Sequence, residues 1–373
     1  MATGSGLIDT HRDDFWMRQA LDLAQRGEGR VEPNPMVGCV VVRNDKCIGQ
    51  GYHQEFGGPH AEANALRGLS REDVSQSTVY VTLEPCSHFG KTPPCADMLC
   101  DLRPQRVVVA MEDPFPKVNG SGISRLKDAG ISTEVGVLRQ EVEALCAPYL
   151  KRVGKGLPWI IAKWAMTLDG KIASRTRDSQ WISNERSREI VHRLRGRVDA
   201  IVVGIRTALA DDPMLTARPA GPRRAIRVVL DNAARLPLSS KLVQTAQEIP
   251  VMVACESSAD EKQVEALRRA GCQIFQSSTA NSEQTLFHVL GHLAAVGCTN
   301  VLVEGGAAVL GSLLDIGEID EVHAFVAPVL LGGQSAISAI GGEGFDTVSV
   351  AQRIVRPIVE ILDGDVYLHG RIR

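Results

Sequence analysis

The sequence reads PHAE at residues 59–62 and PCSHFGKTPPC at residues 85–95. These stretches contain His60, Cys86 and Cys95, side chains of the types that bind zinc, and the acidic residue Glu62. A catalytic zinc site uses three protein ligands and leaves a fourth position for water, whose pKa the metal lowers to about 7. Glu62 is not needed as a ligand, so it is the candidate proton carrier. The two stretches therefore predict a catalytic zinc site.

A structural zinc site is the alternative interpretation of the same residues. Such a site uses four protein ligands, and His88 is available as the fourth. Glu62 would then have no evident role. Taken singly, a His-x-Glu pair is usually a surface feature, and a buried cysteine is usually an inert small apolar side chain. The catalytic interpretation depends on these residues occurring together.

The order of these residues is that of the zinc-dependent nucleobase deaminases, in which two residues separate the cysteines. Here the longer insert from Ser87 to Pro94 separates them. The full run PCSHFGKTPPC, with PHAE before it and EPNPMVGCVVV at residues 32–42, closely resembles the deaminase half of the bifunctional riboflavin biosynthesis proteins. The resemblance extends from about Asp14 to the C-terminus.

The resemblance implies both the fold and the reactions. Members of this family join a diaminohydroxyphosphoribosylaminopyrimidine deaminase to a 5-amino-6-(5-phosphoribosylamino)uracil reductase. We therefore expect an α/β chain with a cytidine-deaminase-like three-layer α/β/α domain at residues 12–150 and a dihydrofolate-reductase-like α/β domain at residues 156–373. The expected cofactors are Zn2+ and NADPH, and the expected substrates are small phosphorylated pyrimidines. The family is also expected to form homo-oligomers.

Length and composition limit the class of protein. A chain of 373 residues with 44% hydrophobic residues is long enough for two cores. The net charge of −3 provides no basic field, so no nucleic-acid partner is expected. The sequence shows no secretory signal and no long apolar run, so no membrane partner is expected. Nine cysteines in such a chain indicate a reducing, cytoplasmic compartment.

Strands and helices are expected to alternate in the first half, which is typical of a layered α/β domain. Apolar residues at helical spacing predict helices, and Val-rich apolar runs predict strands. The start of the helix at Cys95 should favour the thiolate of that residue. The expected helices are Phe15–Arg26, His60–Leu69, Cys95–Leu102 and Gly122–Gly130, and the expected strands are Pro35–Val42, Cys47–His53, Val79–Leu83 and Arg106–Ala110.

A basic stretch punctuated by Gly and Pro, from Ala147 to Pro158, indicates the domain boundary. Beyond it strands and helices alternate again, so a second α/β domain is expected. The expected strands are Trp159–Ala165, Ala200–Val203, Ile226–Leu230, Val251–Ala254, Val301–Val303 and Val322–Pro328, and the expected helices are Asn184–Leu194, Glu261–Ala270 and Leu286–Ala295.

The second half has no G-x-G-x-x-G dinucleotide fingerprint. It has VEGG at residues 303–306, at the end of an expected strand and before the apolar run Ala307–Leu314. Main-chain N–H groups at such a helix start can bind an anion, although a Gly-Gly pair is often only a turn. The stretches AMTLDGK (165–171), DSQWI (178–182), VGIRTALADDP (203–213) and VEGG resemble motifs of the family's reductase domain, which binds NADPH without that fingerprint.

Carried over position by position, the resemblance assigns functional residues in both halves. Cofactor binding is implied for Ala165, Trp181, Thr207, Asp211, Asn232, Gly306, Ala307, Ala308, Val309, Leu310, Gly311 and Ser312. Substrate binding is implied for Ser179, Arg195, Leu215, Arg218 and Glu304 in the reductase half, and for Asn34, His53, His88, Lys91 and Asp113 in the deaminase half. Relatives often carry Ser at the position of Asn232 and Asn at the position of Phe115.

The residue types support the reductase assignment in part. Arg188, His192 and Arg195 share one helical face by spacing, and Arg suits bidentate phosphate recognition. A solvated basic face is the alternative interpretation. The hydride itself is supplied by the nicotinamide, so the protein need only position the reactants. Lys163 and Asp169 are the nearest candidates to assist the transfer.

Three other hypotheses remain open at this point. The first is a deaminase whose C-terminal half is degenerate or structural, which NADPH binding would distinguish. The second is a non-catalytic binding protein stabilised by zinc, in which replacement of Glu62 would change nothing measurable. The third is a cytidine or tRNA deaminase fused to another domain, which the insert between the cysteines and the small net charge disfavour.

Overall fold

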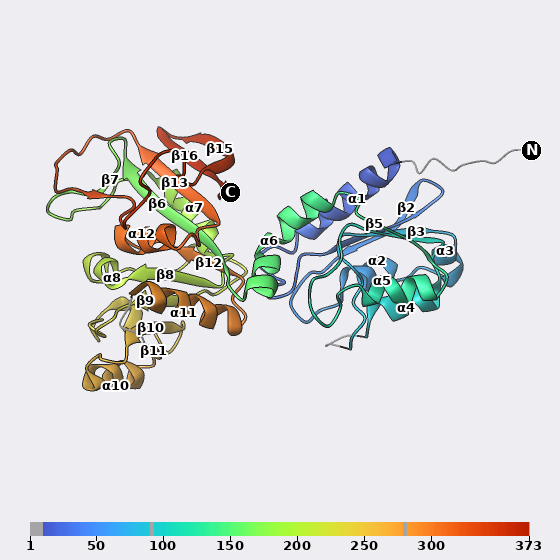
Figure 1. Ribbon diagram of the computed structural model, residues 1–373, viewed down its shortest axis with the longest axis horizontal. Coiled ribbons are helices and arrows are strands. Elements are labelled where there is room, and N and C mark those ends of the chain that lie inside the picture. The colour runs from blue at the N-terminus through green and yellow to red at the C-terminus, as the bar shows by residue number, and fades with distance from the viewer. Residues whose placement is uncertain (1–9, 90–92, 279–281, 373) are drawn as a thin grey trace, which may run out of the picture. The chain divides into compact units, whose positions relative to one another are not determined.

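The computed structural model describes residues 10–89, 93–278 and 282–372 (Figure 1). The chain forms two compact units, the first ending at Lys155 and the second beginning at Gly156. Each unit has its own sheet and its own hydrophobic cores. No helix among the described residues is long and apolar enough to cross a bilayer.

The first unit contains a five-stranded mixed sheet. Its elements are α1 (Thr10–Gln25), β1 (Gly38–Arg43), β2 (Lys46–Tyr52), α2 (Ala61–Leu66), α3 (Arg71–Ser75), β3 (Thr78–Val81), α4 (Cys95–Leu102), β4 (Arg106–Val109), α5 (Ser121–Asp128), β5 (Ser132–Val135) and α6 (Arg139–Lys155). The strand order is β2-β1-β3-β4-β5. β1 is antiparallel to β2 and β3, whereas β3, β4 and β5 are parallel.

Helices cover both faces of this sheet, because successive side chains of a buried strand point to opposite sides. One core joins Val41, Val79 and Val107 to α2, α3, α4 and α5. The other core joins Val40 and Val108 to α1 and α6. This arrangement confirms the predicted three-layer α/β/α class of the first domain.

The last helix of the first unit, α6, extends into a stretch whose composition predicted a domain boundary. α6 continues through Pro148 and ends at Lys155, inside the predicted boundary stretch. A proline removes one main-chain donor from a helix. Val142, Cys146 and Tyr149 nevertheless recur at helical spacing and are buried, so packing against the sheet outweighs that loss.

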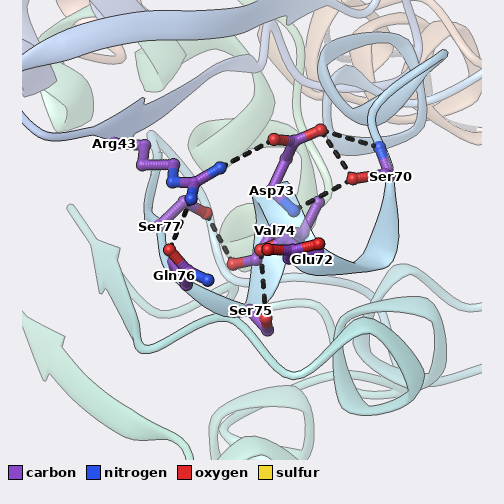
Figure 2. Close-up of polar contacts among 8 residues, drawn as sticks. All are labelled: Arg43, Ser70, Glu72, Asp73, Val74, Ser75, Gln76 and Ser77. Atoms are coloured by element: carbon purple, nitrogen blue, oxygen red, sulfur yellow. Dashed lines mark hydrogen bonds and ion pairs between the residues drawn. The ribbon is translucent and has the colours of Figure 1, made fainter.

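The five-residue helix α3 depends on local polar contacts (Figure 2). The Ser70 hydroxyl accepts a hydrogen bond from the main-chain N–H of Asp73 at 3.1 Å, and the Asp73 carboxylate accepts one from the N–H of Ser70 at 3.2 Å. This capping box satisfies two donors that a helix start leaves unpaired. Arg43 of β1 also donates to Asp73 at 2.8 Å and to Gln76 at 2.5 Å. These contacts connect α3 to the end of β1.

The second unit contains a nine-stranded sheet in the order β11-β10-β9-β8-β12-β6-β13-β16-β15. Its elements are β6 (Trp159–Thr167), β7 (Lys171–Ala173), α7 (Glu185–Arg195), β8 (Ala200–Gly204), α8 (Ile205–Asp211), β9 (Ile226–Leu230), α9 (Lys241–Gln244), β10 (Val251–Glu256), α10 (Glu261–Arg269), β11 (Gln273–Ser277), α11 (Ser282–Ala295), β12 (Asn300–Val303), α12 (Ala307–Asp315), β13 (Glu321–Ala327), β14 (Ile337–Ser338), β15 (Ile354–Leu362) and β16 (Asp365–Ile372).

The strands from β11 to β13 in this order are parallel, and β13, β16 and β15 are antiparallel. One core lies between the sheet and helices α7 to α10, and the other lies against α11 and α12. The carboxyl ends of β9, β8, β12 and β6 therefore meet at one edge, where open α/β sheets bind ligands. The outer strands β11, β15 and β16 are not among the strands predicted from the sequence.

A buried ionic cluster ties α1 to the sheet of the first unit. The Asp13 carboxylate accepts a hydrogen bond from the Tyr80 hydroxyl at 2.8 Å and two from Arg106, at 2.9 and 2.7 Å. Arg106 also pairs with Glu134 of β5. Asp13 is buried, so the charge on each partner depends on the other.

Asp13→Asn is expected to lower the free energy of unfolding of the first unit by about 2–3 kcal/mol, because Arg106 keeps only one of its two carboxylate partners. Urea unfolding followed by circular dichroism would measure this loss. The matched control is Glu143→Gln, which breaks the exposed Arg139–Glu143 pair and should cost less than about 0.5 kcal/mol. A loss at Asp13 no larger than the control would contradict the role of the cluster.

Candidate active sites

Three side chains of the first unit converge from separate elements. His60 is the N-cap residue of α2, Cys86 follows β3, and Cys95 is the first residue of α4. The Nδ1 atom of His60 lies 3.4 Å from the Sγ atom of Cys86 and 3.4 Å from the Sγ atom of Cys95. The three candidate ligand atoms all lie within 4.8 Å of one another. The fold thus brings together the three residues predicted to bind zinc.

The geometry fits a tetrahedral zinc ion. Bonds of about 2.0 Å to nitrogen and 2.3 Å to sulfur place N and S about 3.6 Å apart, close to the two 3.4 Å separations. His88, the candidate fourth ligand, is not part of this group within the described residues. It lines the adjacent cavity instead. Three ligands with an open position favour the catalytic over the structural type of zinc site.

The protein favours a thiolate at Cys86. The Cys95 thiol, the His60 side chain and the Cys95 main-chain N–H, which lies 3.3 Å from Cys86 Sγ, lower the pKa of Cys86. The Cys86 thiolate and burial raise the pKa of Cys95 in turn. The hydrogen bond from His60 to Cys86 raises the pKa of His60. The main-chain N–H of Cys95, at the start of α4, therefore stabilises a thiolate at Cys86, and the preference predicted for the Cys95 thiolate stays a prediction.

Glu62 lies on α2 beside this group and is only 3% exposed. Burial raises its pKa to about 7, although His60 opposes the shift. A carboxyl group that titrates near neutral pH can both accept and return a proton, as general acid–base catalysis requires. His60, Glu62 and Cys86 line a common cavity of about 250 Å³.

The predicted pyrimidine-pocket residues surround the same cavity. Asn34, His53, His88, Asp113 and Phe115 all line it. Lys91 lies outside the described residues. The centroid of the Phe115 ring lies 5.9 Å from that of the His88 ring, so the wall is apolar at this position.

Main-chain contacts orient the polar side chains of this cavity. Asn34 Nδ2 lies 3.1 Å from His53 Nε2, and His53 Nδ1 lies 3.1 Å from the Pro59 carbonyl oxygen. These partners assign the proton to Nδ1 and leave Nε2 as the acceptor. Burial lowers the pKa of His53, which favours this neutral form.

Sequence reasoning missed three polar side chains of the cavity wall, those of Glu84, Tyr149 and Arg152. The Tyr149 hydroxyl donates to Asp113 Oδ1 at 2.8 Å, and Arg152 donates to the Pro33 carbonyl at 2.9 Å. Tyr149 and Arg152 come from α6, far along the chain from His60, Cys86 and Cys95. No local sequence pattern marks them as cavity residues. Glu84 stands in an apolar strand end just before a proline, and that signal could have identified it.

The second unit holds a larger cavity, of about 1020 Å³. Every predicted cofactor or substrate residue of this unit lines the cavity except one. The lining residues are Ala165, Ser179, Trp181, Arg195, Thr207, Asp211, Leu215, Arg218, Asn232, Glu304, Gly306, Ala307, Ala308, Val309, Leu310 and Ser312. The exception is Gly311, where a Cβ atom would lie 2.3 Å from the carbonyl carbon of Gly341. Gly311 therefore permits close packing of α12 and is not on the cavity wall.

Two glycines shape the cavity wall at the start of α12. A Cβ atom at Gly305 would lie 2.5 Å from the Cα of Val203, so only glycine lets the end of β12 approach β8 this closely. Gly306 has φ of +62° and is the N-cap residue of α12. The helix start offers main-chain N–H groups and a positive dipole end, which suit a phosphate group.

A buried ion pair also lines this cavity. Arg195 donates to the two carboxylate oxygens of Glu304 at 2.6 and 2.9 Å, and Lys163 Nζ lies 3.7 Å from the same carboxylate. Burial alone would raise the pKa of Glu304, but Arg195 and Lys163 outweigh it and hold this pKa at about 2. Burial also lowers the pKa of Lys163. Arg195 and Glu304 were both predicted to bind substrate, and in the structure they form an ion pair with each other.

The two candidates to assist hydride transfer have different surroundings. Lys163 lines the cavity. The Asp169 carboxylate does not; it accepts hydrogen bonds from Thr167 at 2.6 Å and from the main-chain N–H groups of Leu331 and Gly332 at 3.0 and 2.7 Å. Asp169 therefore fastens the turn after β6 to the segment after β13, and Lys163 is the better placed of the two.

The departure at Asn232 has a visible consequence. Its side-chain amide donates a hydrogen bond to the Glu256 carboxylate at 2.7 Å. Because Asn232 lines the cavity, this bond holds the Glu256 carboxylate next to the cavity wall.

Arg188, on the predicted basic face of α7, stacks 4.8 Å above the Trp181 ring. Arg188, His192 and Arg195 all line the cavity, so this face is not simply solvated.

Comparisons with known proteins match both units. The family described as cytidine and deoxycytidylate deaminase zinc-binding region matches residues 10–111, and the RibD C-terminal domain matches residues 158–360. The chain is 38% identical to the riboflavin biosynthesis protein RibD of Actinobacillus pleuropneumoniae, over 98% of this chain and 96% of that protein. It is 37% identical to RibD of Escherichia coli (strain K12), over 87% and 90% of the two chains.

Two solved structures have the same fold over nearly the whole chain. Acinetobacter baumannii RibD, form 1, superposes with a TM-score of 0.85 at 35% identity, covering 98% of this chain and 100% of that one. A diaminohydroxyphosphoribosylaminopyrimidine deaminase/5-amino-6-(5-phosphoribosylamino)uracil reductase from Thermotoga maritima superposes with a TM-score of 0.82 at 33% identity, covering 98% and 99%.

Fold and sites together define a bifunctional enzyme with a deaminase domain of the cytidine-deaminase type and a separate reductase domain. The predicted fold class of both halves is confirmed. The chain belongs to the RibD family of riboflavin biosynthesis proteins, and it is a deaminase and reductase of that pathway.

Glu304→Gln tests the buried ion pair of the second unit. The folded pKa of Glu304 is about 2, below the ordinary 4.5, so its charge stabilises the fold above pH 4.5 and this contribution is lost as the pH falls through 2. We expect the variant to lose about 3 kcal/mol of unfolding free energy at pH 7, with a difference that shrinks below pH 4.5.

Urea unfolding at a series of pH values would measure this difference. The exposed Glu343→Gln is the control, and its unfolding free energy should follow the parent protein at every pH. A difference for Glu304→Gln that stays constant from pH 7 down to pH 3 would contradict the assignment.

Proposed function

We propose that the first unit removes the amine at ring carbon 2 of 2,5-diamino-6-(5-phosphoribosylamino)pyrimidin-4(3H)-one by hydrolysis. The second unit would then reduce the ribosyl chain of the product, 5-amino-6-(5-phosphoribosylamino)uracil, to ribityl with NADPH. The deaminase would occupy residues 12–150 and the reductase residues 156–373. The observation that carries the proposal is the convergence of three zinc-type ligands and a buried carboxyl group on one cavity. Nine unpaired cysteines support a cytoplasmic setting.

In the deaminase, His60, Cys86 and Cys95 would hold Zn2+. When bound, the ion would supply a water molecule that is nucleophilic near neutral pH. Glu62 would take a proton from the attacking water and deliver it to a ring nitrogen. It would then take the remaining hydroxyl proton and deliver it to the leaving amine, so that ammonia and the 2-oxo product result. This proton transfer is worth roughly 10²–10⁴-fold in rate.

The remaining cavity residues would orient the pyrimidine. Asn34 and His53 offer neutral hydrogen-bonding groups, and His88 has a buried Nδ1 atom without a protein partner among the described residues. Phe115 N–H and the Tyr149 hydroxyl both donate to Asp113 Oδ1, and these bonds would orient the carboxylate toward the substrate. Lys91 would meet the ribose phosphate, as the family resemblance implies.

In the reductase, Gly306 and the start of α12 would hold the cofactor's phosphates, and Trp181, Thr207 and Asp211 would hold its remaining parts. NADPH would supply the hydride. The ion pair of Arg195 and Glu304 would present a fixed polar wall to the ribosyl chain, with Arg218 free to meet the substrate phosphate. Lys163, buried beside Glu304, is the nearest group that could give a proton to the opening ribose ring.

Glu62→Gln tests the deaminase step. We expect ammonia release from the diaminopyrimidine substrate to fall by at least 10²-fold, because the proton carrier is lost. One zinc per chain should remain, since all three ligands are intact. NADPH oxidation on supplied deaminated substrate should be unchanged. The measurements are an ammonia assay, elemental analysis of zinc, and absorbance at the nicotinamide band.

The exposed Glu72→Gln is the matched control and should leave all three readouts unchanged. Prior chelation of zinc should abolish NADPH oxidation from the diamino substrate but not from the deaminated one. Equal loss of both activities in Glu62→Gln would contradict independent sites, and no loss of either would favour a non-catalytic zinc protein. Ammonia release without any NADPH oxidation would favour the deaminase-only alternative.

We also propose that the chain self-associates through β15. This strand is at the edge of the nine-stranded sheet, and seven of its nine residues are exposed. Exposed apolar edges of this kind promote pairing with another strand. Arg353 and Arg356 precede the centre of the strand at Ile358, and Glu360 and Asp363 follow it. An antiparallel second copy would place the basic half of each strand against the acidic half of the other, so the partner is another molecule of this chain.

Val359→Lys should weaken this association, because it adds a charge to the exposed apolar edge. We expect the mass in light scattering after size exclusion to shift from dimer or higher towards monomer. Val296→Lys is the matched control, because Val296 and Val359 are both 56% exposed and Val296 lies beyond the end of α11. A monomeric parent protein, or an equal shift in both variants, would contradict the proposal.

A further inference from the structure

Glu84 has no part in the deaminase chemistry described above, yet it is among the most buried carboxylates of the first unit, with 4% of its surface exposed. It lies just after β3 and two residues before Cys86. Its two carboxylate oxygens accept hydrogen bonds from main-chain N–H groups alone. The donors are Asp113 at 3.1 Å, Gly120 at 2.9 Å, Gly122 at 2.8 Å and Ile123 at 3.2 Å.

These four donors belong to one segment, which runs from the end of β4 into the first turn of α5. Gly120 is the N-cap residue of α5, and Gly122 and Ile123 lie in its first turn. A negative charge at a helix start is stabilised by the N–H groups and by the helix dipole. Glu84 thus supplies, from a distant strand, the capping that this helix lacks in its own sequence, because Gly120 has no side chain to cap it.

The same segment forms one wall of the deaminase cavity. Asp113, Phe115 and Val118 line the cavity, and all three lie between β4 and α5. On its other side the wall is held by the Tyr149 hydroxyl, which donates to Asp113. The position of the wall is therefore fixed from two directions, by Glu84 and by α6.

Glu84 also belongs to the segment that carries a metal ligand. Pro85 separates it from Cys86, and a Cβ atom at Gly122 would lie 2.0 Å from the Pro85 carbonyl oxygen. The cavity wall therefore packs directly against the main chain next to Cys86. A shift of one relative to the other would change the width of the cavity at the point where the reacting ring carbon must lie.

We propose that Glu84 is a positioning residue for deamination, which sets the distance between the Cys86 segment and the cavity wall from Asp113 to Ile123. The proposal rests on the assignment of this cavity to deamination. It requires a carboxylate, because four N–H donors need four acceptor lone pairs. A glutamine offers two lone pairs and adds two N–H groups, so it would leave buried donors unpaired and push the wall away.

Glu84→Gln is expected to raise the KM for the diaminopyrimidine substrate and to lower kcat/KM for deamination by about 10- to 100-fold, since misplacement by about 1 Å costs that much. Zinc content should remain at one per chain. The reductase activity of the same preparation, on supplied deaminated substrate, should be unchanged and reports the concentration of enzyme, whereas the retained zinc reports a folded first unit.

The matched control is Asp13→Asn, which also removes a buried carboxylate of this unit but away from the cavity. It should lower stability and leave the deaminase KM unchanged. If Glu84→Gln behaves like this control, with an unchanged KM and only less folded protein, Glu84 is merely structural and the proposal is wrong.

Glu84→Asp keeps the charge and the four lone pairs but shortens the side chain by about 1.5 Å, one C–C bond. If Glu84→Gln does not fold, the Glu84→Asp variant tests the positioning role instead. A raised KM with retained zinc supports the positioning role, and the parent KM overturns it. Absence of deamination in the parent protein would instead refute the assignment of the cavity, so the two failures can be told apart.

Discussion

Glu62, Glu84 and Glu304 are carboxylates buried at the two sites, and each has to be compensated, because an isolated charge in a protein interior costs several kcal/mol. The chain does this in three ways. Glu304 is paired with Arg195 and Lys163 and stays ionised at any ordinary pH. Glu84 is held by four main-chain N–H groups without a basic partner. Glu62 has only its own main-chain N–H, the Cys95 thiol and the nearby His60, and burial outweighs them and brings its pKa to about 7.

This difference separates fixed groups from the group that moves protons. A carboxylate with a pKa of about 2 cannot serve as an acid near neutral pH, so Glu304 can only hold charge and shape. The partners of Glu62 do not outweigh its burial, so its pKa of about 7 lets it act both as an acid and as a base. The surroundings of each carboxylate, and not the residue type, decide its role.

The sequence predicted most reliably what is local. The ligands His60, Cys86 and Cys95 lie in two short stretches whose spacing is set by a helix start and a strand end. Central parallel strands such as β8 and β12 are buried on both faces, so their apolar runs are unambiguous. The edge strand β15 exposes nearly every residue, which removes the alternation that a strand prediction needs.

Contacts between distant segments could not be predicted in this way. Arg195 and Glu304 were each assigned to substrate, but 109 residues separate them, and only the fold reveals that they pair. Tyr149 and Arg152 reach the deaminase cavity from a helix that continues through Pro148, where composition indicated a boundary. In the reductase half the site residues came from the family resemblance, because no fingerprint marks this way of binding a dinucleotide. Gly311 shows the limit of that route, since it lies in the carried-over run but serves packing.

The two cavities are each lined by residues of one unit only, the smaller by residues 33–152 and the larger by residues 163–337. The difference in volume matches the difference in the molecules that each cavity would hold. About 250 Å³ suits a single heterocycle with part of its ribose, whereas about 1020 Å³ can hold a dinucleotide and a substrate together. Because each unit also has its own cores, neither site needs the other to be complete. Fusion of the two activities in one chain therefore has to be explained by something other than the construction of the sites, such as equal supply of both enzymes or a shared assembly through β15.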